Sequence, residues 1–355
     1  MDKLIIASMR PNAGKTGLIV GLGRVLGRKI GYMKPLGDRL LYRKKQLWDQ
    51  DASLVTTVFG LAENPMDMSL GFDHAKLRFM YNEESTKARL LEAVAHIEPD
   101  RELLFIESGR DISTGISVYL DPISLAEQVG GRLVVVVGGD ENDILDDITF
   151  LKKRIDSSGS ELGGVIINKL ADPENFKDIS LPLVEETGVT VLGLIPFTPE
   201  LNHYSIGYLA DHLFAKVVAG ASGLNNTVHT ILVGAMSAQA ALRSPAIKME
   251  HSLMITGGDR TDMILAALEN NAVGLILTNN ILPPSNIIAK ASERQIPLLL
   301  VNADTYQAAK QIDDLQPLLT RGDTAKIERW EQLVREHVSV DRIVLLDPRE
   351  YRPPD

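Results

Sequence analysis

Short apolar runs alternate with amphipathic stretches through the first two hundred residues of the chain. Residues 16–26 carry apolar side chains at helical spacing, which predicts a helix directly after the first run. The apolar runs are bounded by glycine or charge and are candidates for buried strands: residues 4–7, 29–33, 103–106, 133–137, 165–167 and 189–195. Continuous apolar strands separated by helices are typical of a parallel sheet covered on both faces. We therefore expect a doubly wound α/β fold in this part.

The pattern restarts in the last third of the chain. Residues 219–226 are small, polar and glycine-containing, and we expect a linker there. Strands are predicted at 230–233, 252–255, 274–277 and 297–301, and helices at 261–268, 287–291 and 328–338. This half predicts a second, smaller α/β domain. The expected division is a first domain at 1–218, a second at 226–340 and a tail at 341–355 with a frayed end.

Composition narrows the function classes. The 355 residues suggest two domains at roughly 150 residues each, and the 45% apolar content is enough for a sizeable core. A net charge of −10 and only 5% aromatic residues argue against a nucleic-acid binder. The absence of cysteine excludes disulfides, zinc–thiolate and iron–sulfur sites, and a catalytic thiol. No apolar run is long enough to span a membrane and the start does not resemble a signal peptide, so we expect a cytoplasmic protein with no membrane partner.

The segment between the first strand and the first helix carries the strongest chemical signal. Residues 8–16, here called the phosphate loop, read Ser-Met-Arg-Pro-Asn-Ala-Gly-Lys-Thr. A Gly-Lys-Thr at a strand-to-helix turn fits a Walker A motif, in which Lys15 reaches phosphates and Thr16 ligates Mg²⁺. Met9 stands where the motif usually has its first glycine. The alternative is an ordinary helix start. The predicted nucleotide-binding residues here are Asn12, Ala13, Gly14, Lys15, Thr16 and Gly17.

Polar residues at the ends of later predicted strands support this interpretation. Lys34, Glu107, Asn168 and Pro196 each lie at or just after such a strand, and Asp51 follows soon after Lys34. Ligands of open parallel sheets bind beyond the carboxyl ends of the strands. Simpler roles stay open for three of them: a solvated lysine at 34, a helix cap at 51 and a turn cap at 168.

This ordered set resembles the dethiobiotin synthetase branch of P-loop proteins, which includes the ATP-binding part of cobyrinic acid a,c-diamide synthase. The resemblance covers residues 1 to about 215 and implies a P-loop fold, ATP and Mg²⁺ as cofactors, and a homodimer. It also implies residue roles: phosphate contacts and catalysis by Lys15 and Lys34, Mg²⁺ ligation by Thr16, Asp51 and Glu107, and adenine contacts by Asn168 and the backbone near Pro196.

The chain departs from that family just after Glu107. Dethiobiotin synthetases usually continue with Gly-Ala-Gly-Gly, whereas this chain has Ser-Gly-Arg-Asp-Ile-Ser-Thr-Gly at 108–115. Arg110 and Asp111 change the polarity where a second substrate would lie, so a diamino acid substrate is not expected. The cobyrinic synthases also carry a glutaminase with a cysteine nucleophile, and the absence of cysteine excludes glutamine amidotransfer by this chain.

The second half resembles the DRTGG domain, which is associated with regulation. The matching pieces include Thr-Gly-Gly-Asp-Arg at 256–260, although the order differs from the name-giving string. A Gly-Gly turn that opens a helix is a candidate anion site, so Gly257, Gly258, Asp259 and Arg260 are predicted to bind an effector. The alternative is a tight turn with an Asp259–Arg260 surface interaction. The two domains in this order resemble the N-terminal half of long phosphotransacetylases, and we do not expect acetyl transfer by this chain alone.

Two functions are weighed as the main candidates. The first is an ATP- and Mg²⁺-binding sensor or regulator of metabolism, with an effector or partner at the second domain. The alternative is an ATP-dependent synthetase or ligase that phosphorylates a carboxylate or carbamate. A nucleic-acid partner would rest only on the basic cluster of Arg39 and residues 43–45, and we do not expect one. The acidic run at 140–147 predicts a solvated helix start rather than a metal site, and the seven histidines lack metal-ligand spacing.

Overall fold

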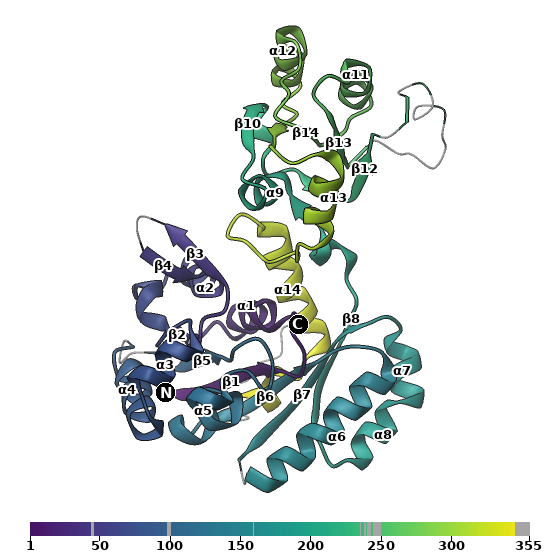
Figure 1. Ribbon diagram of the computed structural model, residues 1–355. Coiled ribbons are helices and arrows are strands. Elements are labelled where there is room, and N and C mark those ends of the chain that lie inside the picture. Colours follow the sequence, from purple (N-terminus) through teal and green to yellow (C-terminus); the bar gives the residue numbers. More distant parts are fainter. Residues whose placement is uncertain are drawn as a thin grey trace. The chain divides into compact units, whose positions relative to one another are not determined.

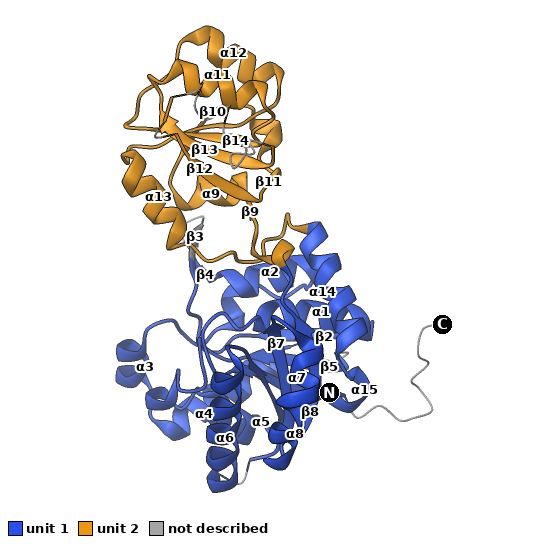
Figure 2. Ribbon diagram, turned by 90° about the vertical axis from the view of Figure 1, so that its right-hand side faces the viewer, with its two compact units in different colours: residues 1–198, 324–355 blue, residues 199–323 orange. Residues whose placement is uncertain are grey.

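The computed structural model describes residues 1–43, 46–97, 101–158, 160–234, 236–237, 239, 243 and 250–344 (Figure 1). Two compact units are present (Figure 2). Unit 1 comprises Met1–Thr198 together with the chain from Thr324 onward, and unit 2 comprises Pro199–Asp323. Unit 1 is therefore discontinuous in sequence, with unit 2 inserted between its last strand and its final helices.

Unit 1 is built on a six-stranded sheet in the order β2-β5-β1-β6-β7-β8, and all neighbouring pairs are parallel. Its strands are β1 (Asp2–Ser8), β2 (Ile30–Met33), β5 (Leu103–Glu107), β6 (Arg132–Val137), β7 (Leu162–Leu170) and β8 (Val191–Pro196). All five residues of β5 and the last five of β1 and β6 are buried, as expected for strands covered on both faces. The carboxyl ends of these parallel strands form one edge of the sheet.

Helices and one hairpin complete unit 1. The hairpin consists of β3 (Leu40–Arg43) and β4 (Gln46–Asp49), which pair antiparallel. The helices are α1 (Lys15–Leu26), α2 (Gln50–Phe59), α3 (His74–Met80), α4 (Glu83–Ala95), α5 (Pro122–Val129), α6 (Glu141–Ser158), α7 (Pro173–Ile179), α8 (Leu181–Glu186), α14 (Thr324–His337) and α15 (Val340–Ile343).

Helix α14 returns the chain to unit 1 after unit 2. It packs along α1, and its residues Ile327, Trp330, Leu333 and Val334 are buried. The backbone N–H of Ser339 then donates to the carbonyl of Leu192 in β8, which fixes the end of α14 to the sheet. The segment expected to close the second domain therefore belongs to unit 1, because its apolar face is buried there.

Unit 2 contains a five-stranded sheet in the order β10-β15-β14-β13-β12, in which β10 is antiparallel to β15 and the other pairs are parallel. The sheet strands are β10 (Lys216–Ala219), β12 (Thr230–Val233), β13 (Ser252–Gly257), β14 (Gly274–Thr278) and β15 (Leu298–Leu300). A small pair, β9 (Tyr204–Ser205) and β11 (Thr227–Val228), precedes them. The helices are α9 (Ile206–His212), α11 (Thr261–Glu269), α12 (Ser285–Glu293) and α13 (Thr305–Asp313).

The expected strands and helices are confirmed in type and position, but the expected linker is wrong. Residues 219–226 are folded within unit 2, beginning with the last residue of β10. A Cβ on Gly220 would lie 2.2 Å from the carbonyl oxygen of Ile296, so this glycine is required for close packing. Small residues here serve packing rather than chain flexibility. The compact units thus divide near 198 and 323 rather than at the expected limits of 218, 226 and 340, and the frayed end predicted at 351–355 lies outside the described residues.

No helix in the described part of the chain has the length and apolar character needed to cross a membrane.

Candidate functional site

The phosphate loop joins β1 to α1 at the carboxyl edge of the unit 1 sheet. Gly14 is the N-cap of α1 with φ of 104°, and Asn12 also has a positive φ of 60°. An L side chain at Gly14 would be strained, and its Cβ would lie 2.5 Å from Nδ2 of Asn168. Gly14, predicted to bind nucleotide, is thus also required by the loop's own backbone.

Lys15 extends its ammonium group back along the loop. Its Nζ donates to Oγ of Ser8 at 2.9 Å and to the backbone carbonyl of Arg110 at 3.0 Å. The side chain is buried, and this desolvation lowers the pKa of Lys15 below its ordinary value. The segment after Glu107, which departs from the family pattern, therefore contributes a backbone acceptor to the loop lysine.

Glu107 ends β5 and meets two hydroxyl groups. Its Oε1 accepts from Oγ1 of Thr16 at 2.8 Å, and its Oε2 accepts from the phenol of Tyr32 at 2.8 Å. Burial, with a contribution from Asp51, raises the pKa of Glu107 to about 7. Its two hydrogen-bond donors are neutral hydroxyl groups, while the charges of Lys34 and Lys15 act on it electrostatically and favour its ionised form.

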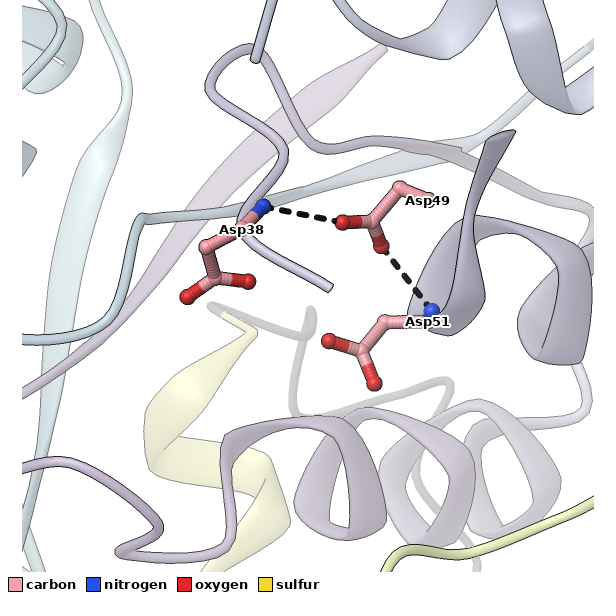
Figure 3. A group of neighbouring side chains, drawn as sticks. All are labelled: Asp38, Asp49 and Asp51. Carbon is pink, nitrogen blue, oxygen red and sulfur yellow. Dashed lines mark hydrogen bonds between the residues drawn. The ribbon is translucent and has the colours of Figure 1, made fainter. Parts of the chain in front are cut away.

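Lys34 lies among three aspartates from the loop after β2 and the start of α2. Its Nζ is 2.5 Å from Asp38, 2.6 Å from Asp51 and 3.5 Å from Asp49. Figure 3 shows the aspartates, with Asp49 accepting from the backbone N–H groups of Asp38 and Asp51. Their ligand oxygens lie within 4.8 Å of one another. We call Lys34, Asp38, Asp49 and Asp51 the aspartate cluster.

The charges of the aspartate cluster stabilise one another. Burial alone would lower the pKa of Lys34, but Asp51 and the other nearby carboxylates hold it well above its ordinary value. Burial would likewise raise the pKa of Asp51, yet Lys34 and Arg39 lower it to about 2. The lysine and Asp51 are therefore both charged at neutral pH, and Lys34 is not the solvated side chain of the simpler interpretation.

Arg39 connects the aspartate cluster to the phosphate loop. Its Nη1 donates to Oδ1 of Asp51 at 3.2 Å, and its Nη2 donates to Oδ1 of Asn12 at 2.7 Å. Arg39, the first residue of the basic cluster considered as a nucleic-acid contact, is thus bonded within this site. Residues 44 and 45 lie outside the described residues.

Asn168 and Lys169 brace the phosphate loop from β7. Nδ2 of Asn168 donates to the carbonyl of Ala13 at 2.7 Å, and Nζ of Lys169 donates to the carbonyl of Asn12 at 3.0 Å. Pro196 ends the neighbouring strand β8 and pairs in register with Leu170, so it lies at the same sheet edge. The amide of Asn168 is thus engaged by the loop, and an adenine contact would be an additional role.

Gly17 and Trp330 explain why the start of α1 is glycine-rich. A Cβ on Gly17 would lie 2.2 Å from the indole ring of Trp330, and one on Gly14 would lie 3.2 Å from the same ring. Trp330 comes from α14 and is 7% exposed. Gly17, predicted to bind nucleotide, is required for the close contact between α1 and α14.

The candidate effector residues of unit 2 lie between β13 and α11. A Cβ on Gly258 would lie 1.7 Å from the carbonyl oxygen of Ile281, so only glycine fits this turn. Arg260 donates to the carbonyls of Gly234 and Met236, and its Nε is 3.3 Å from Asp262. The ion pair of the simpler interpretation is therefore made with Asp262, not with Asp259.

Several residues of the site were not singled out from the sequence: Ser8, Tyr32, Asp38, Asp49 and Lys169. Tyr32 stands two residues before Lys34 in an otherwise apolar strand, a position from which its phenol could have been placed on the same side. Asp49 stands two residues before Asp51, and an aspartate at the N-cap of a helix such as α2 is a recognisable signal.

Comparison with known proteins agrees with this arrangement. An AAA domain family model matches residues 2–205, and a DRTGG domain model matches residues 208–315. The phosphate acetyltransferase of Synechocystis sp. is 24% identical over 370 residues, which cover 97% of this chain and 51% of the relative. That of Pseudomonas aeruginosa is 25% identical, covering 99% of this chain and 53% of the relative. The chain spans about half the length of these curated relatives.

Solved structures with partial similarity include the MinC:MinD cell division complex of Aquifex aeolicus. It is 16% identical with a TM-score of 0.39, and the match covers 57% of this chain and 84% of the other. The CBS and DRTGG domains of Clostridium perfringens pyrophosphatase, in complex with the activator diadenosine tetraphosphate, are 23% identical with a TM-score of 0.29, covering 33% and 48%. These TM-scores are too low to support the fold, which rests on the sheet order.

The family matches confirm the expected combination of a P-loop domain and a DRTGG domain, and they confirm the resemblance to the N-terminal half of phosphotransacetylases. A P-loop domain implies nucleotide binding. The chain belongs to the AAA domain family and carries a DRTGG domain after its P-loop domain.

Proposed function

We propose that the chain binds ATP together with Mg²⁺ at the carboxyl edge of the unit 1 sheet and acts as a nucleotide-dependent sensor or regulator of metabolism. One observation carries the proposal. At the N-terminus of α1, Lys15 bonds to Ser8 of the phosphate loop, and the hydroxyl of Thr16 bonds to the buried carboxylate of Glu107. Backbone N–H groups at a helix N-terminus together with a lysine form a phosphate-binding arrangement.

The residues present fit a magnesium ion. Thr16 and Glu107 offer oxygen ligands that already lie 2.8 Å apart, and Asp51 supplies a further buried carboxylate nearby. Mg²⁺ prefers oxygen ligands and keeps several waters, so two or three protein ligands are sufficient. Bound there, the ion would neutralise phosphate charge. Lys15 and the amides of the phosphate loop would hold the phosphates in place.

The DRTGG domain supports the regulatory part of the proposal. We propose that its turn at 257–260 takes an effector. The names of the curated relatives favour phosphate acetyl transfer as the setting for this regulation. A homodimer is proposed from the resemblance to dethiobiotin synthetases.

A second buried lysine favours one alternative. Lys34 lies beyond the phosphate loop, and an ATP-dependent ligase would use such a lysine on a phosphorylated carboxylate or carbamate. Release of ADP with a panel of carboxylate and amine substrates would support the ligase. Nucleotide binding without turnover on that panel would support the regulator.

Replacing Lys15 tests nucleotide binding. We expect Lys15→Ala to raise the Kd for Mg²⁺–ATP about 10- to 150-fold, because charge-assisted hydrogen bonds contribute about 1.5–3 kcal/mol. Isothermal titration calorimetry measures the change. Lys177→Ala is the control, since Lys177 is half exposed and pairs with Glu174. Equal affinity of wild type and Lys15→Ala would contradict the proposal.

The pKa of Glu107 predicts how the effect of magnesium depends on pH. Glu107 must be ionised to ligate Mg²⁺, and its pKa is raised to about 7, so ionisation increases through neutral pH. We expect the gain in ATP affinity on adding Mg²⁺ to rise about tenfold between about pH 6 and about pH 8. The same titration on Glu107→Gln corrects for protonation of the nucleotide itself. An identical pH profile in wild type and Glu107→Gln would exclude Glu107 as a ligand.

A further inference from the structure

We propose that Arg39 contacts the terminal phosphate of the bound nucleoside triphosphate. This inference rests on the proposed function and names one more residue of the same site. Its basis is the position of the guanidinium group, which reaches from the aspartate cluster to the side chain of Asn12 in the phosphate loop. No family resemblance stated above assigns a role to this residue.

The backbone of Arg39 is fixed by hydrogen bonds, and its side chain is partly exposed. Its backbone N–H donates to Oδ2 of Asp49, and its carbonyl accepts from the N–H of Gln50 at 2.7 Å. The side chain is 25% exposed, in contrast to the 2% exposed side chain of Lys34. Arg39 is therefore a partly exposed cation that is anchored at this loop by its backbone.

Arg39 contacts the phosphate loop at Asn12, the residue whose backbone carbonyl also accepts from Lys169 of β7. Arg39 also bonds to Asp51. Glu107 bonds to Thr16, and the charge of Asp51 acts on the Glu107 carboxyl group, so the proposed magnesium ligands lie near the Asp51 carboxylate. A phosphate held next to that magnesium ion would lie at the Arg39 end of the loop.

Charge repulsion by a bound magnesium ion would favour the exchange of Asp51 for a phosphate as the partner of Arg39. Asp51 is bonded to both Lys34 and Arg39. A magnesium ion that ligates Asp51 would repel both cations, and Arg39 is the more exposed of the two. Its planar guanidinium can then make two parallel hydrogen bonds to phosphate oxygens, a geometry that lysine cannot provide.

The test compares nucleotides that differ by one phosphate. Calorimetry gives Kd for ATP and for ADP, each with Mg²⁺, in the wild type, Arg39→Gln and Arg39→Lys. We expect Arg39→Gln to lose about 10- to 100-fold in ATP affinity and much less in ADP affinity. Arg39→Lys should recover only part of the loss. Arg101→Gln is the matched control, because it removes an arginine paired with Glu63 near the opposite, amino edge of β5.

The outcomes separate this inference from the function on which it rests. If wild type binds ATP and Arg39→Gln keeps the same ATP-to-ADP preference, the inference is wrong and the proposed function stands. If wild type binds neither nucleotide, both are wrong. A partly unfolded variant lowers the binding stoichiometry rather than the ratio of the two Kd values, so that ratio remains informative.

Discussion

Lys34→Met is expected to lower the free energy of unfolding by about 3–5 kcal/mol, because it removes a buried cation that pairs with three carboxylates, of which Asp51 keeps the guanidinium group of Arg39 as a partner. The ammonium of Lys34 lies 2.5 and 2.6 Å from Asp38 and Asp51, and 3.5 Å from Asp49, which is fully buried. Methionine keeps much of the side-chain volume, so the loss reports on charge rather than on a cavity. Denaturant titration without nucleotide measures it.

Magnesium provides the internal check on this prediction. The ligand oxygens of Asp38, Asp49 and Asp51 lie within 4.8 Å of one another. Without the lysine, a divalent cation should bind there and raise the melting temperature of Lys34→Met more than that of the wild type. Lys177→Met, at an exposed ion pair, should change stability by about 1 kcal/mol or less. A similarly small change in Lys34→Met would show that the aspartate cluster does not need its lysine.

The parts of the site that the sequence predicted are those set by local pattern. Gly14, Lys15 and Thr16 stand between an apolar run and a stretch with helical spacing, and Glu107 ends another apolar run. This pattern predicts that the Gly-Lys-Thr turn and Glu107 both lie at the carboxyl edge of the sheet. A parallel sheet brings such ends together regardless of strand order. The positions of these residues at the sheet edge could therefore be predicted from the sequence.

The parts that the sequence did not predict depend on how distant segments meet. The partners of Lys34 follow from the path of the loop and the β3–β4 hairpin between residues 34 and 51. Tyr32 looks like an ordinary core aromatic until its phenol meets Glu107. The same limit explains the linker at 219–226, where small residues serve close packing against β15 and its preceding turn. Composition alone cannot distinguish a flexible glycine from a closely packed one.

Helix α14 is the largest element whose place could not be foreseen. It begins at Thr324, beyond the DRTGG match that ends at 315, and yet it packs on α1 of unit 1. Its periodicity predicted an amphipathic helix but not the surface that it covers. Gly17 and Gly21 allow a close contact between α1 and α14. Their purpose could be recognised only from the structure, in which both glycines lie against Trp330.

Trp330→Ala is expected to lower the free energy of unfolding of unit 1 by about 3–5 kcal/mol, the usual range for removing a buried tryptophan. The indole is 7% exposed and lies against Gly17, and Leu333 and Val334 of the same helix are fully buried. Denaturant titration followed by circular dichroism measures the loss. Arg329→Ala, at a partly exposed neighbouring position on α14, should change stability by about 0.5 kcal/mol or less.

A double-mutant cycle with Gly17 separates this contact from a general loss of packing. Gly17→Ala alone should destabilise the protein, because its Cβ would lie 2.2 Å from the indole ring. When Trp330→Ala has already removed that ring, the added methyl group no longer meets it and should even fill part of the cavity. The combined loss is therefore expected to be smaller than the two single losses together by about 1 kcal/mol or more. Simple additivity would mean that Trp330 does not pack on Gly17, and that α14 is held to unit 1 by its other contacts.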